Sequence, residues 1–178
     1  MRIRPLLLAL AAAALPCALP AQHDHATHHP THAAHPAPAH PAAADSGFAA
    51  LQSRGHAAMG VDQYTSTHRF DALPDGGRIE LQRDTDDAAG IATIRAHLAG
   101  IAQAFARGDF ATPAAVHARE VPGAATMAAR RAAIRYTYRD LPRGGEVRIT
   151  TTDPEALAAV HAFMAFQRLD HRSNGENR

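Results

Sequence analysis

The chain has little cysteine, no lysine and no large excess of charge of either sign. Its one cysteine, Cys17, lies near the N-terminus, so the rest of the chain has no disulfide, thiolate ligand or cysteine nucleophile. The 18 basic residues are all arginine and stand against 17 acidic residues, which gives a formal net charge of +1. This balance gives no support for a nucleic-acid-binding protein, and no nucleic-acid partner is expected.

Catalytic motifs are also missing. The sequence contains no G-x-S-x-G or H-E-x-x-H motif, no phosphate-binding glycine loop and no dinucleotide-binding glycine pattern. Asp84, Asp86 and Asp87 resemble the start of a calcium loop, but the required glycine and closing glutamate are absent. These aspartates are expected to cap a helix instead. We therefore do not expect an enzyme, and no catalytic or organic-cofactor-binding residue is assigned.

The first 21 residues have the layout of a secretory signal peptide. Two arginines precede an unbroken run of leucine and alanine over residues 6–15, and small residues and prolines follow up to Ala21. This run is too short to span a bilayer. Cleavage after Ala21 is expected, which removes Cys17 and gives a periplasmic or secreted chain without a membrane span. A lipoprotein signal ending at Cys17 is the alternative, and Pro16 directly before the cysteine disfavours it.

Residues 22–41, QHDHATHHPTHAAHPAPAHP, form a histidine tract with seven histidines in twenty positions. Apart from proline, the tract has no apolar residue larger than alanine, so residues 22–45 are expected to be a disordered tether. Neutral imidazoles bind Cu(II), Ni(II) and Zn(II), and binding is expected to be loose because no preformed cage holds the ligands. The tract has no methionine, which argues against Cu(I). The candidate ligands are His23, His25, His28, His29, His32, His35 and His40.

An internal repeat organises the domain that is expected over residues 46–172. LPDGGRIEL at residues 73–81 and LPRGGEVRI at residues 141–149 share Leu-Pro-x-Gly-Gly, and each copy stands between two alternating runs. Glycine supplies the positive φ of a hairpin turn, so each copy predicts a β-hairpin, and a capped helix signal follows each one. We predict an α+β fold, in which two β-hairpin–helix units form a four-stranded antiparallel sheet with helices packed on one face.

Further elements are expected outside the two units. A helix over about residues 47–59 precedes the first hairpin, and a connector over 110–121 and a short helix over 124–133 join the units. Residues 173–178 are expected to be a disordered tail. The helix after each hairpin has an apolar stripe, formed by Ile91, Ile94, Leu98, Ile101 and Phe105 in the first and by Leu157, Val160 and Met164 in the second.

Alternation along the strands separates two faces of the sheet. The face expected beneath the helices carries His68, Phe70, Ile79, Leu81, Ile134, Tyr136, Tyr138, Val147 and Ile149. The opposite face could bind an anion or a protein partner, or it could be a solvated surface of mixed charge. Its two glutamates favour the solvated surface. Its charged residues are Arg69, Arg78, Glu80, Arg135, Arg139, Glu146 and Arg148.

Four residues of the domain are candidates for a metal site. His161 and Met164 are three apart on the last helix, and His97 lies at the edge of the other helix's stripe. If the two helices lie side by side, these three residues approach one another, and histidine with methionine suits copper better than zinc or calcium. The alternative is that Met164 fills the core and the histidines flank it. His68 is either a ligand or a buried histidine held by a hydrogen bond.

Several stretches carry a resemblance, among them AMGVDQYTSTHRF, IRAHLAGIAQAFARGDF, VPGAATM and IRYTYRDLPRGGEVRITTTDPEALAAVHAFMAFQRLDH. Over residues 57–172 the chain resembles an uncharacterised family of small exported bacterial proteins, in which one such domain follows a His- or Met-rich leader. The resemblance implies export and these domain boundaries. Some members bear the name aspartate carbamoyltransferase, but this chain is too short for that fold and has no carbamoyl-phosphate loop, so that activity is not expected.

The sequence is compatible with two functions. The first is an exported accessory protein that binds Cu(II), Zn or Ni through the histidine tract and buffers or delivers the metal. The second is a periplasmic binding module, in which the α+β domain recognises a protein partner or a small ligand and the tract is only a tether.

Overall fold

A computed structural model describes residues 41–60 and 62–173. The signal peptide, nearly all of the histidine tract and residues 174–178 of the predicted tail lie outside the described residues. Within residues 41–60 and 62–173, no helix combines the length and the apolar character of a membrane span. The elements are α1 (Pro41–Met59), the 3₁₀ turn η1 (Gln63–Thr65), β1 (Ser66–Leu73), β2 (Gly76–Arg83), α2 (Ala88–Ala106), α3 (Ala111–His117), α4 (Ala124–Ala129), the 3₁₀ turn η2 (Arg131–Ala133), β3 (Ile134–Leu141), β4 (Gly144–Thr151) and α5 (Pro154–Asp170).

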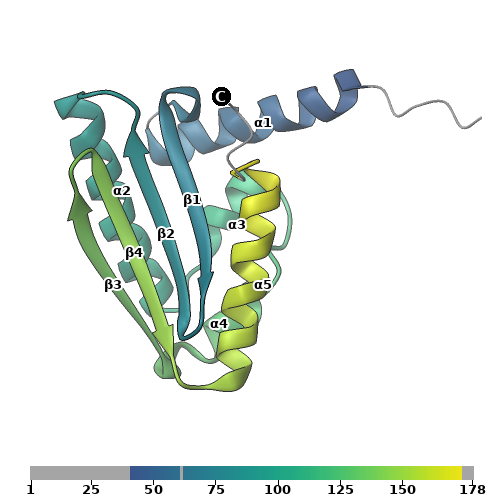
Figure 1. Cartoon of the computed structure of the whole chain (residues 1–178). Coiled ribbons are helices and arrows are strands. Elements are labelled where there is room, and N and C mark those ends of the chain that lie inside the picture. The colour runs from purple at the N-terminus through teal and green to yellow at the C-terminus, as the bar shows by residue number, and fades with distance from the viewer. Residues whose placement is uncertain (1–40, 61, 174–178) are drawn as a thin grey trace, which may run out of the picture. The chain divides into compact units, whose positions relative to one another are not determined.

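The four strands form one antiparallel sheet in the order β1-β2-β4-β3. The two predicted hairpins are joined through their second strands, where Ile79 of β2 lies opposite Val147 of β4. In Figure 1, α2 lies behind the sheet and contacts β3 and β4, whereas α5 runs along the β1 side. The predicted α+β class, with two hairpins in a four-stranded sheet that helices contact, is confirmed.

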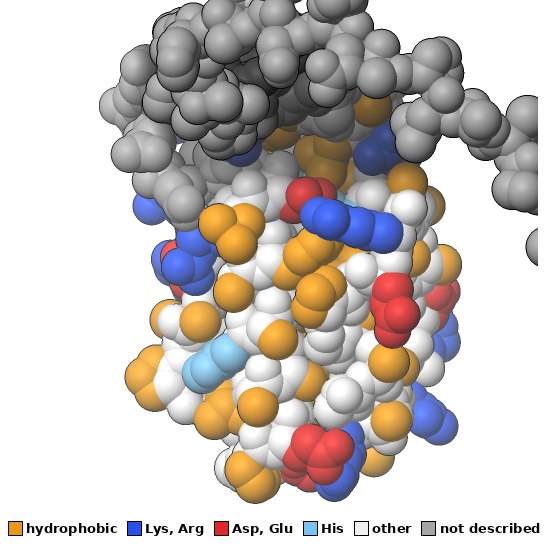
Figure 2. Space-filling model, turned by 90° about the vertical axis from the view of Figure 1, so that its right-hand side faces the viewer, with side chains coloured by type: hydrophobic (Ala, Val, Ile, Leu, Met, Phe, Trp, Pro, Cys, Tyr) orange, Lys and Arg blue, Asp and Glu red, His pale blue; other side chains and the backbone are white. Residues whose placement is uncertain are grey.

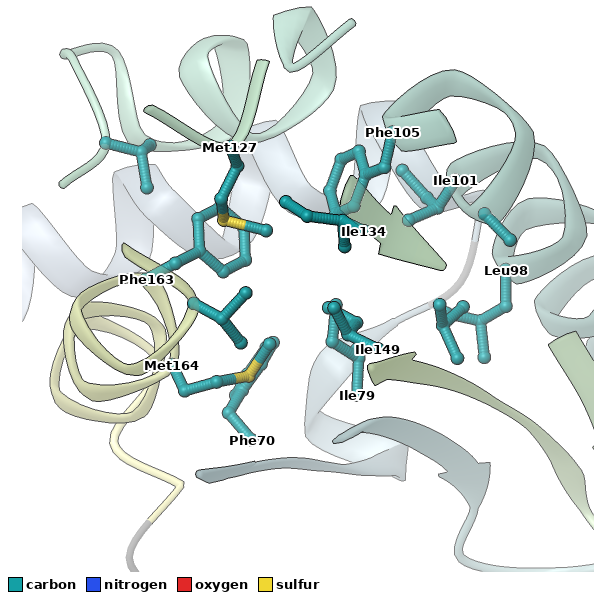
Figure 3. Close-up of a cluster of buried hydrophobic side chains, with 14 of the residues drawn as sticks. Phe70, Ile79, Leu98, Ile101, Phe105, Met127, Ile134, Ile149, Phe163 and Met164 are labelled. Atoms are coloured by element: carbon teal, nitrogen blue, oxygen red, sulfur yellow. The ribbon is translucent and has the colours of Figure 1, made fainter. Parts of the chain in front are cut away.

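The hydrophobic core lies between the sheet and these two helices. Figure 3 shows Met164 of α5 beside Phe70 of β1 and Phe163 of α5 beside Met127 of α4, and all four side chains are buried. On α2 the stripe is buried as predicted, except for the half-buried Ile91 at its start. On α5 the prediction was wrong for Leu157, which is only half-buried, because the helix turns another stripe toward the sheet: Ala156, Ala159, Val160, Phe163, Met164 and Gln167.

Both main helices begin at the predicted aspartate caps. The carboxylate of Asp87 accepts a hydrogen bond from the N–H of Gly90 at the start of α2. At the start of α5, where Thr152 or Asp153 was expected, Asp153 is the cap and accepts from two N–H groups at 2.9 and 3.0 Å. These bonds, led by that from Ala156, lower the pKa of Asp153.

The glycines of the repeat differ from the prediction. The turns are Pro74–Asp75 and Pro142–Arg143, and the glycines begin the following strands. Only Gly76 has a positive φ, of 148°. A Cβ on Gly76 would lie 2.1 Å from the carbonyl oxygen of Ile149, and one on Gly144 would lie 2.0 Å from that of Leu81. These glycines therefore allow β2 and β4 to approach, and they do not supply a common turn conformation.

The helices outside the two units also differ from expectation. α1 begins at Pro41, six residues before the expected start, and takes in residues 41–45 of the predicted tether. Proline at the first helical position and the alanines that follow favour this earlier start. The connector contains α3, and the expected helix over residues 124–133 is divided into α4 and η2.

Candidate functional site

The main candidate site is a cavity of about 60 Å³, lined by four of the six histidines that follow the tract. We call it the histidine cavity. His68 comes from β1, His97 from α2, His117 from the end of α3, and His171 directly follows α5. The rest of the lining is apolar, except for Thr112 and Gln167. Four separate parts of the chain therefore bring imidazole groups to one small, largely apolar space.

His171 is at the centre of the ring contacts in this cavity. Its ring centroid lies 5.2 Å from that of His68, 5.0 Å from that of His117 and 5.3 Å from that of Phe70. Its Nδ1 lies 3.0 Å from Oε1 of Gln63, a hydrogen bond in which the ring N–H donates. This bond ties the end of α5 to η1 and leaves Nε2 as the unprotonated nitrogen of the neutral ring.

His117 has a structural role. Its side chain is buried, its Nδ1–H donates to the carboxylate of Asp170, and its Nε2 lies 2.9 Å from Oε1 of Gln167. Asp170 also accepts a hydrogen bond of 2.6 Å from Arg119. Because both ring nitrogens are engaged, His117 holds α3 against α5 and has no nitrogen left for a ligand.

Burial keeps the other rings of the cavity neutral. Removal from water lowers the pKa of His97 to about 4 and, with a further contribution from His117, that of His171 to about 4. Burial lowers the pKa of His68 well below its ordinary value, and His171 and His97 lower it further. Among the described residues, neither His68 nor His97 has a hydrogen-bond partner for its ring. Their neutral imidazoles can therefore act as ligands.

The structure groups the predicted domain residues differently from the sequence analysis. His97 and His68 line the histidine cavity, but His161 and Met164 do not. The Nε2–H of His161 donates to the carbonyl oxygen of Leu73 at 2.9 Å, and Met164 is fully buried in the core. His97 is separated from this pair because α2 packs on β3 and β4 while α5 packs mainly on β1.

A larger groove adjoins the histidine cavity. This outer groove has a volume of about 710 Å³ and runs between α1, β1 and the end of α5. It shares His68, Phe70 and His171 with the cavity, so these rings separate the two spaces. Two polar atoms of its lining, Oε1 of Gln52 and Nε2 of Gln63, are buried without a hydrogen-bond partner. The rings of His68 and His171 therefore also line a groove that contains polar side chains.

The arginine face of the sheet is largely neutralised by its own acidic neighbours. Arg78 pairs with Asp71, Arg148 with Asp75, and Arg139 with Glu146 at 2.7 Å. The sequence analysis placed Glu146 in water, but it is buried, because β4 is a central strand and its neighbours cover it. Figure 2 shows a different side of the molecule, the one on the right of Figure 1 where α5 lies, and there too a few acidic and basic side chains adjoin among hydrophobic ones. These pairings favour the mixed-charge interpretation over an anion site.

The sequence analysis missed His117, which lines the histidine cavity, and Gln63, which lines the outer groove and accepts a hydrogen bond from His171. His117 lies in a connector without periodicity, and Gln63 lies in a short 3₁₀ turn, so neither gave a local signal. Within the described ranges, no three His, Cys, Asp or Glu side chains are arranged to hold a metal ion together. The tract ligands from His23 to His40 lie outside these ranges.

Comparison of the chain with protein-family models, curated proteins and solved structures gave no match.

Proposed function

We propose that the protein is an exported accessory protein that binds divalent transition-metal ions through imidazole groups and buffers or delivers them. The observation that carries this proposal is the distribution of histidine. Seven of the 13 histidines lie within residues 22–41, and four of the others line one cavity. Imidazole is a preferred ligand of Cu(II), Zn(II) and Ni(II).

The chemistry of the tract suits exchange of metal more than catalysis. Ligands without a preformed cage bind with modest affinity and select poorly between metals. Exposed imidazoles have a pKa of about 6.5, so their protonation releases the metal as the medium becomes acidic. The signal-like residues 1–21 support action in the periplasm or outside the cell, and the similarity to small exported bacterial proteins supports the same location.

Calorimetric titration of the full chain with Cu(II), Zn(II) or Ni(II) tests this proposal. The comparison is a full chain in which the seven tract histidines are replaced by glutamine, and His56→Gln is the matched control because His56 is exposed. We expect the tract replacement to remove about one or two bound ions per chain, given four to six ligands per ion. Unchanged stoichiometry and affinity would contradict metal binding by the tract.

The outer groove favours a second candidate function, recognition of a small ligand or protein partner by the domain. Its volume of about 710 Å³ lies within the range of ligand pockets. The unpaired amide atoms of Gln52 and Gln63 offer one acceptor and one donor. A ligand that stays bound to the tract-substituted chain after chelator treatment, and is lost in Gln52→Ala, would support this function.

A further inference from the structure

Two histidine rings in the cavity have the spacing of ligands to a shared metal ion. The ring centroids of His68 and His171 are 5.2 Å apart, with an interplanar angle of 58°. With metal–nitrogen bonds of about 2.0–2.1 Å, two imidazoles on one ion have ring centres roughly 4.5–5.2 Å apart for bond angles of about 90–110°. The pair therefore already has a separation that coordination of one ion requires.

We propose that His68 and His171 form a two-imidazole site for a divalent transition-metal ion within the folded domain. This inference rests on the proposed metal-binding function and adds a second site, separate from the tract. The lining of the cavity contains no carboxylate, which disfavours Mg²⁺ and Ca²⁺. Among first-row divalent ions, Cu(II) binds nitrogen ligands most tightly, so Cu(II) is the expected occupant.

Gln63 orients one of the two ligands. Histidines that bind metals usually donate their second N–H to an oxygen acceptor, which fixes the tautomer and the ring direction. Nδ1 of His171 has this arrangement with Oε1 of Gln63. The position of Gln63 in turn depends on Gly55 of α1, because a Cβ on Gly55 would lie 1.8 Å from Nε2 of Gln63. A glycine and a glutamine outside the cavity thus hold the imidazole of His171 in place.

The outer groove supplies a route to the site. His68 and His171 line both the groove and the histidine cavity, so an ion in the groove meets these rings first. Because the described part of the chain has no three-ligand group, the pair supplies two ligands and leaves other positions to water or an added imidazole. Two protein ligands are fewer than the three or four of catalytic and structural zinc sites, and such weak retention suits delivery.

The test uses the full chain with the seven tract histidines replaced by glutamine, titrated with Cu(II). One Cu(II) per chain is expected. His68→Gln and His171→Gln should each weaken binding by at least about tenfold, because loss of even an outer-shell partner of a ligand costs about 10–100-fold in metal affinity. His56→Gln, which removes an exposed histidine, should leave the affinity unchanged. Nitrogen couplings in the electron paramagnetic resonance spectrum should fall from two imidazoles to one in each single variant.

A further variant tests the site without replacing a buried histidine, in case those replacements unfold the chain. Gly55→Ala adds a helix-favouring residue within α1 and displaces Gln63, so the fold should be kept while Cu(II) binds about tenfold more weakly. Thermal unfolding by circular dichroism checks the fold of each variant. The site would be overturned if the tract-substituted chain bound no Cu(II), or if the folded His68→Gln and His171→Gln variants bound Cu(II) as tightly as the tract-substituted chain does. A different result would contradict the proposed function: metal binding by the full chain that stays the same when the tract histidines are replaced.

Discussion

At the scale of single residues, the domain holds several histidines in their neutral form. The pKa of His97 and that of His171 are lowered to about 4 by burial, and the pKa of His68 is lowered in the same direction. In the unfolded chain these imidazoles have a pKa of about 6.5. The unfolded state therefore binds more protons than the folded state between about pH 6.5 and pH 4.

This difference predicts how stability depends on pH. The stabilisation is fully present above about pH 6.5 and is lost as the pH falls toward 4, by up to about 1.4 kcal/mol per pH unit for each histidine. Urea unfolding of metal-free protein between pH 7.5 and 4.5 measures this slope, and His97→Gln should make it shallower. Equal stability at pH 7 and pH 5 would contradict burial of neutral rings. Asp75 and Asp153 also have lowered pKa values, but these carboxylates change the free energy of unfolding at a lower pH than the histidines do.

A second prediction at the residue scale concerns how much the hydrogen bonds of Asp170 contribute to stability. Its carboxylate accepts from the buried His117 and from the exposed Arg119. Asp170→Ala leaves the N–H of His117 buried without a partner, so the free energy of unfolding should fall by about 1–3 kcal/mol. Chemical denaturation measures the change, and Asp86→Ala, at an exposed position, is the control. A loss no larger than that of the control would show that the His117 bond contributes little.

At the scale of elements, the hairpins depend on close approach between central strands. Gly144 begins β4, and a Cβ there would lie 2.0 Å from the backbone oxygen of Leu81. Since backbone in the middle of a sheet cannot easily move, Gly144→Ala should destabilise the domain by about 2 kcal/mol or more. Gly100→Ala is the matched control, because nothing lies within 4 Å of its added Cβ and α2 gains a better helix former.

The control should raise stability by about 0.5–1 kcal/mol, as alanine does in place of glycine within a helix. Thermal or urea unfolding of both variants gives the comparison. If Gly144→Ala were as stable as the original chain, close strand approach would not be the reason for the repeated glycines.

Elements whose signals are local could be predicted from the sequence. Alternation and the Pro-x-Gly-Gly repeat gave both hairpins, and Asp87 and Asp153 cap the helices as expected. The role of Gly144 could not be predicted, because it depends on which strands pair at the centre of the sheet. Glu146 was wrongly placed in water for the same reason: alternation gives the face of a strand but not its position between neighbours.

At the scale of the whole molecule, the histidine cavity depends on tertiary structure alone. Its imidazoles come from β1, α2, α3 and the end of α5, and their sequence spacing gives no sign that they meet. Helical spacing instead suggested His97 with His161 and Met164, because a single sequence does not show which strands each helix covers. The histidine tract could be recognised without knowledge of the fold, since its composition alone indicates imidazole ligands.

Elemental analysis of the protein, purified without chelator from the cells that make it, tests the central claim most directly. Inductively coupled plasma mass spectrometry of the purified chain should find copper, zinc or nickel at about one ion per chain or more, and mostly copper if the nitrogen ligands set the preference. The tract-substituted chain, purified in the same way, should hold less. Protein that carries only trace transition metal, and takes up none when these ions are added, would contradict the proposed function.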